Sequence, residues 1–229
     1  MRTIGLIGGM TWESTALYYR IMNQEVRARV GGHHSAPLLV ASPDFDAISV
    51  AQDRGDWGAV ASALITAARH LADAGADLLV IASNTAHFVA DQVEAAAEMP
   101  LLNIIDVAAR RLEEAGISSV AVLGTRWTMS DGFYLDRLSS NGIDAMIPEE
   151  PTRAEIDRII VEELASGVIE DGSRRVCVDA IDILADEGAE GALLACTELG
   201  MLVAEDDARI PGFDTTRIHA VAAVDAALD

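Results

Sequence analysis

The chain has 229 residues, of which 51% are hydrophobic, and its formal net charge is −21. This length is enough for one large domain or for two ordinary lobes that each bury a core, and no low-complexity run indicates disorder. The acidic composition argues against nucleic acids and anionic membranes as partners, because it repels phosphate groups rather than releasing counterions from them.

All 16 basic side chains are arginines, and the chain contains no lysine. This absence excludes a Schiff base with pyridoxal phosphate, a P-loop lysine and a lysine general base. An acidic, lysine-free chain is typical of a high-salt cytoplasm, and a GC-rich genome is an equally good explanation. The N-terminus MRTIGLIGGM lacks a signal-peptide pattern and no stretch approaches a membrane-spanning length, so we expect a cytoplasmic protein.

Short apolar runs alternate with helical patterns along the whole chain, as at residues 59–74 and 156–165, where apolar residues have helical spacing. This alternation predicts an α/β fold in which parallel sheets carry helices on both faces. The expected strands are residues 3–8, 37–42, 78–83, 101–106, 119–124, 145–148, 192–196 and 210–213.

The segment LADAGAD at residues 71–77 is repeated as LADEGAE at residues 184–190. In each copy a helix is expected to end at the glycine before an apolar strand, and Ser83 and Cys196 both lie eight residues after that glycine. The runs GLIGG and AVLGT also correspond. The sequence therefore predicts two pseudo-symmetric lobes, each a parallel sheet flanked by helices, formed by residues 1–100 plus 212–229 and by residues 101–211.

Ligands of open α/β sheets bind beyond the carboxyl ends of the strands. Ser83 and Cys196 fall at such ends, as do Gly9 and Thr125, so we expect the active site in the cleft between the lobes. There Ser83 and Cys196 approach a bound molecule from opposite sides.

Cys196 is the candidate nucleophile or base, because the start of the helix after it favours a thiolate and lowers the thiol pKa. The alternative is that Cys196 is only a small buried hydrophobe, which is the interpretation we favour for Cys177. Ser83 also suits an ordinary helix N-cap, a role compatible with function. Asn84, Thr85 and Thr197 offer groups that can hold a small carboxylate beside backbone N–H groups.

The histidines and glycines predict less. His87 is at least as well explained by a hydrogen-bonded structural role as by proton transfer. His33 and His34 are adjacent but have no third ligand in view, so we predict no metal site. GLIGGM does not match G-x-G-x-x-G, so a nucleotide is a poor ligand, and close approach of the backbone to a small ligand explains these glycines better.

Six motifs resemble those of the cofactor-independent aspartate/glutamate racemase family over essentially the whole chain. They are GLIGGMTWEST, SNTAH, LLNIID, LGTRWTM, ACTELG and FDTTRIHA. The resemblance implies an isomerase with two pseudo-symmetric lobes, a homodimer, a small-molecule amino-acid substrate and no cofactor. It also implies proton transfer at Cα from opposite faces, by Cys196 and Ser83, with Met10, Gln52 and Thr125 at the substrate.

This chain departs from the family pattern in two ways. Ser83 stands where cysteine is common, and Glu155 stands where aspartate-acting relatives tend to carry a substrate-binding lysine. Arg153, Arg158 or Arg54 is then expected to bind an acidic substrate, or the substrate is neutral or basic. Two alternatives remain open: a single-cysteine enzyme of the hydantoin racemase, decarboxylase or maleate isomerase type, and a small-molecule-binding pseudoenzyme.

Overall fold

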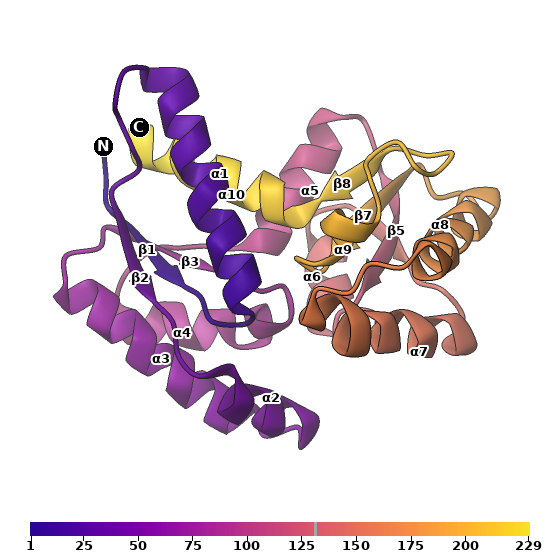
Figure 1. Ribbon diagram of the computed structural model, residues 1–229, viewed down its shortest axis with the longest axis horizontal. Helices are drawn as coiled ribbons and strands as arrows, with labels where there is room; N and C mark the ends of the chain where they lie inside the picture. The colour runs from indigo at the N-terminus through magenta and orange to yellow at the C-terminus, as the bar shows by residue number, and fades with distance from the viewer. Residues whose placement is uncertain (131) are drawn as a thin grey trace. The chain divides into compact units, whose positions relative to one another are not determined.

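A computed structural model of the chain describes residues 1–130 and 132–229 (Figure 1). It contains two compact units, one formed by Met1–Ile104 with His219–Asp229 and the other by Ile105–Ile218. Within the described residues each unit has a four-stranded sheet, with strand orders β2-β1-β3-β4 and β6-β5-β7-β8, and every strand pair is parallel. The two sheets have the same topology, which confirms the predicted pair of α/β lobes.

In the first unit, helices cover both faces of the sheet (Figure 1). Alternate strand residues such as Ile4 and Leu6 pack against α1 and α10, whereas Ile7 and Ile81 pack against α2, α3 and α4, as the alternation of side chains along a strand requires. The elements are β1 (Ile4–Ile7), α1 (Trp12–Val30), β2 (Leu38–Ala41), α2 (Phe45–Asp53), α3 (Trp57–Asp73), β3 (Leu78–Ile81), a 3₁₀ helix η1 (Thr85–Val89), α4 (Ala90–Ala97) and β4 (Leu101–Leu102).

In the second unit, the core between the sheet and helices α7, α8 and α9 contains Leu123, Ile159, Ile181 and Leu194. The division between the two units falls inside the last helix, α10. The elements are α5 (Ile104–Glu114), β5 (Ser119–Gly124), α6 (Phe133–Ser140), β6 (Asp144–Met146), α7 (Glu150–Arg158), a π helix η2 (Ile159–Glu163), a 3₁₀ helix η3 (Leu164–Ser166), α8 (Asp171–Asp186), β7 (Gly191–Ala195), α9 (Leu199–Leu202), β8 (Gly212–Asp214) and α10 (Thr215–Leu228).

The repeated segment forms the same helix end in both units. Gly75 after α3 and Gly188 after α8 have φ of 91° and 116°, a region that glycine adopts without steric cost. In each case the residue after the glycine closes the turn. Ala76 N–H donates to the Leu71 carbonyl at 3.0 Å, and Ala189 N–H donates to the Leu184 carbonyl at 2.9 Å. The sequence repeat therefore encodes one repeated helix-to-strand connection.

The structure corrects two expectations about element boundaries. The strand expected at residues 101–106 pairs only over Leu101–Leu102, and α5 begins at Ile104. Residues 212–218, expected in the first lobe, belong to the second unit, because β8 pairs with β7 through Leu193 and Phe213. No helix in the part of the chain that the structure describes is long and apolar enough to span a membrane.

Candidate functional site

Ser83 lies at the carboxyl end of β3, in the middle of the first sheet. Ile81 is in register with Ile7 of β1, and the next residue, Ala82, donates its N–H to the Ile7 carbonyl at 2.9 Å. Ser83 follows directly and is 8% exposed. Its Oγ accepts a hydrogen bond from Ala86 N–H at 3.3 Å, so the predicted capping role is present and the hydroxyl proton of Ser83 is not used in that bond.

His87 is bound on both sides of its ring. Because a carbonyl oxygen only accepts, Nδ1 must carry the proton that is donated to the Ser83 carbonyl at 2.7 Å. Nε2 accepts the N–H of Ile104 at 3.1 Å. His87 is thus a neutral, buried histidine that holds the Ser83 turn against the start of α5. This geometry favours the structural interpretation over a role in proton transfer.

The other residues expected at the substrate in this unit are buried. Met10 packs in the core beneath α2 and α3, and Gln52 lies near the end of α2. Asn84 and Thr85 follow Ser83 into η1 and are 3% and 8% exposed. Asn84 and Thr85 thus lie just beyond the carboxyl end of β3, and the substrate-binding roles of all four residues stay predictions.

Gly9 occupies the tight turn that leads from β1 to α1. Its φ is 81°, and a Cβ atom there would lie 2.5 Å from the Pro43 carbonyl oxygen. The same turn is held by Thr15, whose Oγ1 accepts Gly9 N–H at 2.7 Å. Close approach to the Pro43 backbone therefore already requires this glycine, whereas the expected approach to a small ligand stays a prediction.

In the second unit, Thr125 and Cys196 follow neighbouring strands at one edge of the sheet. Gly124 at the end of β5 is in register with Ala195 at the end of β7, and the two polar residues come directly after them. A Cβ atom at Gly124 would lie 2.7 Å from the Ala195 carbonyl oxygen, so the strands approach closely where the site begins. The alignment of Ser83 with Cys196 predicted from the repeat thus holds in the strand register of both sheets.

The Cys196 thiol donates a hydrogen bond to a buried carboxylate. Its Sγ lies 3.2 Å from Glu198 Oε2, and Thr197 Oγ1 donates to the same oxygen at 2.5 Å. All three residues are 5–6% exposed. The motif ACTELG contains Glu198, to which the sequence alone assigned no role. Its position two residues after Cys196 was the available signal.

Burial and the negative charge of Glu198 raise the pKa of Cys196 well above its ordinary value. The expected lowering is therefore wrong for this structure. Backbone N–H groups of Glu198 and Leu199 do favour the thiolate, but their effect is smaller than that of burial. The helix that follows, α9, has only four residues, too few to build a strong dipole. In the resting protein Cys196 is a thiol.

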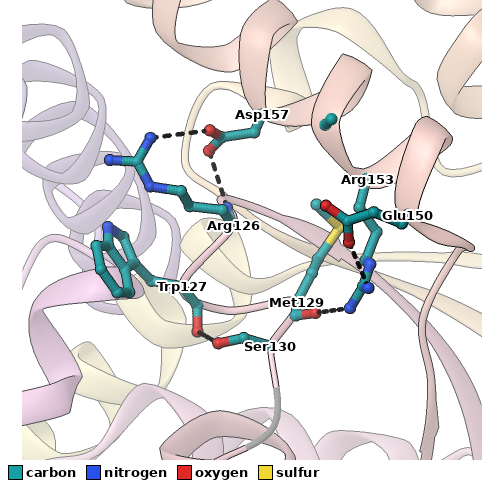
Figure 2. Close-up of a pocket in the computed structure, with 8 residues that line it drawn as sticks. Arg126, Trp127, Met129, Ser130, Glu150, Arg153 and Asp157 are labelled. Atoms are coloured by element: carbon teal, nitrogen blue, oxygen red, sulfur yellow. Dashed lines mark hydrogen bonds and ion pairs between the residues drawn. The ribbon is translucent and has the colours of Figure 1, made fainter. Parts of the chain in front are cut away.

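The loop after β5 and helix α7 line a pocket of about 510 Å³ (Figure 2). On one side Arg126 binds Asp157 through its backbone N–H at 2.8 Å and through Nη1 at 3.4 Å. On the other side lie Arg153 and Glu150. Sequence reasoning missed Arg126 and Asp157, because only the fold brings residues 126 and 157 together. The remaining lining residues are Trp127, Met129, Ser130 and Ala154.

Arg153 is the residue of this pocket with hydrogen-bonding capacity to spare. Its Nη1 donates to the Met129 carbonyl at 3.0 Å and its Nη2 to Glu150 Oε2 at 2.5 Å (Figure 2). Among the described residues, the buried Nε of Arg153 has no hydrogen-bond partner. Glu150 is 76% exposed, so its ion pair with Arg153 is solvent-facing and weak. A guanidinium whose carboxylate partner faces solvent can donate to another carboxylate in its place.

Arg158, the second arginine considered for an acidic substrate, is already engaged. Its Nη2 donates to Glu155 and to Glu163, both at 2.8 Å. The hydrogen bond from Arg158 lowers the pKa of Glu155, which keeps that carboxylate charged and paired. Arg54 is exposed and ends α2. Of the three arginines, Arg153 lies in a pocket of the described residues.

Cys177 has the core environment that the sequence indicated. Burial raises the pKa of Cys177 to about 12, and its side chain packs in the core of the second unit. His33 and His34 are exposed in a loop. Within residues 1–130 and 132–229, no group of three or more His, Cys, Asp or Glu side chains is placed to hold a metal ion.

The fold and these two turns define a two-unit α/β protein that carries a hydroxyl in one unit and a thiol at the equivalent position of the other. The chain matches the family model described as Asp/Glu/Hydantoin racemase over residues 7–223, and it belongs to that family.

Solved structures and a curated relative agree with this assignment. A structure from Yersinia pestis, described provisionally as an Asp/Glu racemase, is 46% identical with a TM-score of 0.94, and all of both chains is covered. An aspartate racemase homologue from Pyrococcus horikoshii OT3 is 33% identical with a TM-score of 0.87, again over both whole chains. The broad specificity amino-acid racemase RacX of Bacillus subtilis (strain 168) is 23% identical over 164 residues, 70% of this chain and 69% of the relative. Racemases are isomerases, so the predicted enzyme class is confirmed.

Proposed function

We propose that the protein is a cofactor-independent racemase that acts on aspartate or glutamate. The observation that carries the proposal is the equivalent position of Ser83 and Cys196 after the matching strands β3 and β7. Racemisation removes a proton from one face of Cα and returns one to the other, so it needs a proton-transferring group for each face. The names of the aspartate racemase homologue and of the amino-acid racemase RacX support an amino-acid substrate.

The Cys196 thiol and the Ser83 hydroxyl differ in acidity, so we propose that they play different roles in the reaction. Cys196, once deprotonated, takes the α-proton from one enantiomer. A serine hydroxyl has a pKa well above the value of about 10 of tyrosine, so Ser83 is a weak base. Ser83, or a water molecule that it holds, instead delivers a proton on the other face. The hydroxyl of Ser83 is free to donate in this way, because its bond to Ala86 uses the oxygen as acceptor.

The carbanion formed at Cα is stabilised through the substrate carboxylate, which becomes an enediolate. Backbone N–H groups at the two turns and the hydroxyls of Thr85 and Thr197 are the groups we propose as donors to it. The absence of lysine supports this cofactor-free chemistry, since no side chain of the chain can carry pyridoxal phosphate as a Schiff base.

Arg153 is the residue that we propose to bind the side-chain carboxylate of an acidic substrate. Its guanidinium has a buried, unpartnered Nε, and Glu150, the carboxylate that it binds among the described residues, faces solvent. A carboxylate that displaces Glu150 can bind the guanidinium with two parallel hydrogen bonds. Glu155 does not oppose this, because Arg158 pairs with it.

The test is loss of the Cα proton in D₂O, followed by NMR, with a panel of L- and D-amino acids at several salt concentrations. Exchange with aspartate or glutamate is the expected result. Exchange with other carboxylic acids only would favour the single-cysteine alternative. No exchange, combined with stabilisation of the fold by an added ligand, would favour a binding protein. The Cys177→Ala variant is the matched control and should exchange like the parent, since Cys177 is a core residue.

A further inference from the structure

We propose that Glu198 is the positioning residue that receives the Cys196 thiol proton and holds it while the thiolate acts on the substrate. The inference rests on the proposed function and deepens it, because it explains how a buried thiol becomes a base. The pair shares one proton and one negative charge in both of its forms.

The geometry gives Cys196 a partner for each protonation state. As a thiol, it donates to Glu198 Oε2 at 3.2 Å. As a thiolate, it is favoured by the backbone N–H groups of Glu198 and Leu199. A sulfur with an acceptor on one side and N–H donors on another can lose its proton without losing its hydrogen bonds.

The carboxylate is also held in place. Thr197 Oγ1 donates to the same Oε2 at 2.5 Å, so this oxygen is fixed between the hydroxyl and the thiol. Glu198 is only 5% exposed, and a buried carboxylate is costly unless hydrogen bonds or a partner stabilise its charge. Thr197 and Cys196 supply those hydrogen bonds, so the carboxylate stays beside the sulfur, where it can receive the thiol proton.

The proton steps balance without any added reagent. In the first step the S–H bond breaks and an O–H bond forms on Glu198, which leaves a thiolate and a neutral carboxylic acid. In the second step the thiolate forms a new S–H bond with the α-proton, and the electrons of the C–H bond pass to Cα and the substrate carboxylate. Ser83, or the water that it holds, delivers a proton to the opposite face and regains one from solvent. Glu198 releases its proton to solvent, which restores the resting pair.

The first test is titration of the Cys196 thiol in a Cys177→Ala background, which leaves one cysteine in the chain. The readouts are the ultraviolet absorbance of the thiolate and the rate of alkylation by iodoacetamide across pH. Glu198→Gln removes the negative charge, so the ionisation midpoint should fall by at least one pH unit, with a roughly tenfold faster alkylation near neutral pH. Glu187→Gln, which changes an exposed acid, should leave the midpoint unchanged.

The second readout is Cα exchange in the same variants. Although its thiol ionises more readily, Glu198→Gln should lose about 100-fold or more in exchange rate, because glutamine cannot hold the proton. Glu198→Asp should restore part of the exchange. An unchanged midpoint, or full exchange in a folded Glu198→Gln variant, would overturn the proposal. If the parent exchanges no substrate, the proposed function fails and the titration alone decides the role of Glu198.

Discussion

Asp77 and Glu190 occupy equivalent places in the two units and make equivalent hydrogen bonds. Asp77 Oδ2 accepts the N–H of Thr3 at 2.6 Å, just before β1. Glu190 Oε2 accepts the N–H of Ser119, the first residue of β5, at 3.2 Å and that of Ser118 at 2.7 Å. Their own N–H groups donate to the carbonyls of Thr3 and Ser119 at 2.8 and 2.9 Å. The acidic residue that ends each repeated segment therefore fixes the first strand of its unit.

This relationship predicts how stability depends on pH at Glu190. Hydrogen bonds from the backbone N–H groups of Ser118 and Ser119 lower its pKa below the ordinary value of 4.5. The stabilisation is therefore present above that pH and is lost as the pH falls below it. Glu190→Gln should unfold at lower urea concentration than the parent near pH 7, and the difference should shrink toward about pH 3. A difference that stays constant across pH would contradict this assignment.

A second pH effect arises from His219, which is buried and neutral. Its Nε2 donates to the Leu102 carbonyl at 2.8 Å, and Nδ1 accepts from the Tyr18 hydroxyl at 2.9 Å. Burial, with a smaller effect of His87, lowers the pKa of His219 to about 3. Between about pH 6.5 and 3 the unfolded chain binds a proton that the folded chain does not, so folding stability falls as the pH drops through this window.

Replacing His219 tests that sign. The unfolding free energy of His219→Gln should fall less steeply than that of the parent between about pH 6 and 4. The two slopes should differ by up to about 1.4 kcal/mol per pH unit. His34→Gln, which alters an exposed histidine, is the matched control and should follow the parent. Equal slopes for the parent and the His219 variant, measured by urea unfolding, would contradict the neutral assignment.

The sequence repeat predicted the fold well because strand register follows from it. In each unit a helix ends at a glycine, Gly75 or Gly188, and a central strand follows. Ser83 and Cys196 are the same number of residues after these glycines, so they occupy equivalent positions beyond the strands of the two sheets. The apolar residues at 101–106 do not show where the strand ends and helix α5 begins. There the N–H of Ile104 binds His87, a contact that the local sequence does not contain.

The site was harder to predict because its chemistry depends on contacts between elements. The rule that helix starts favour thiolates is sound, but at Cys196 burial and Glu198 outweigh it. Among the described residues, the Nε of Arg153 lacks a hydrogen-bond partner because of how α7 packs against the loop after β5. The homodimer and the cytoplasmic location stay predictions.

Arg153 should determine the preference for acidic substrates. Loss of a charge-assisted hydrogen bond costs about 1.5–3 kcal/mol, so Arg153→Ala should raise KM for aspartate or glutamate by roughly 10-fold to 100-fold. Arg54→Ala, which alters an exposed arginine after α2, is the matched control and should leave KM unchanged. Steady-state kinetics on both variants separate the two arginines. An unchanged KM in Arg153→Ala would remove that residue from the substrate site.

Ser83 should limit one direction of the reaction. A thiol is far easier to deprotonate than a serine hydroxyl, so Ser83→Cys should raise turnover from the enantiomer whose α-proton faces residue 83. Turnover from the other enantiomer, where Cys196 removes the proton, should change less. Initial rates measured separately from L- and D-substrate give the comparison. Equal gains in both directions would mean that the two faces are not assigned as proposed.

The central claim is that Cys196 removes the α-proton, and its most direct test is Cα exchange in D₂O by the Cys196→Ser variant. We expect the folded Cys196→Ser variant to exchange the Cα proton of neither enantiomer, whereas Cys177→Ala should exchange both like the parent. Retained exchange by Cys196→Ser with either enantiomer would contradict the claim.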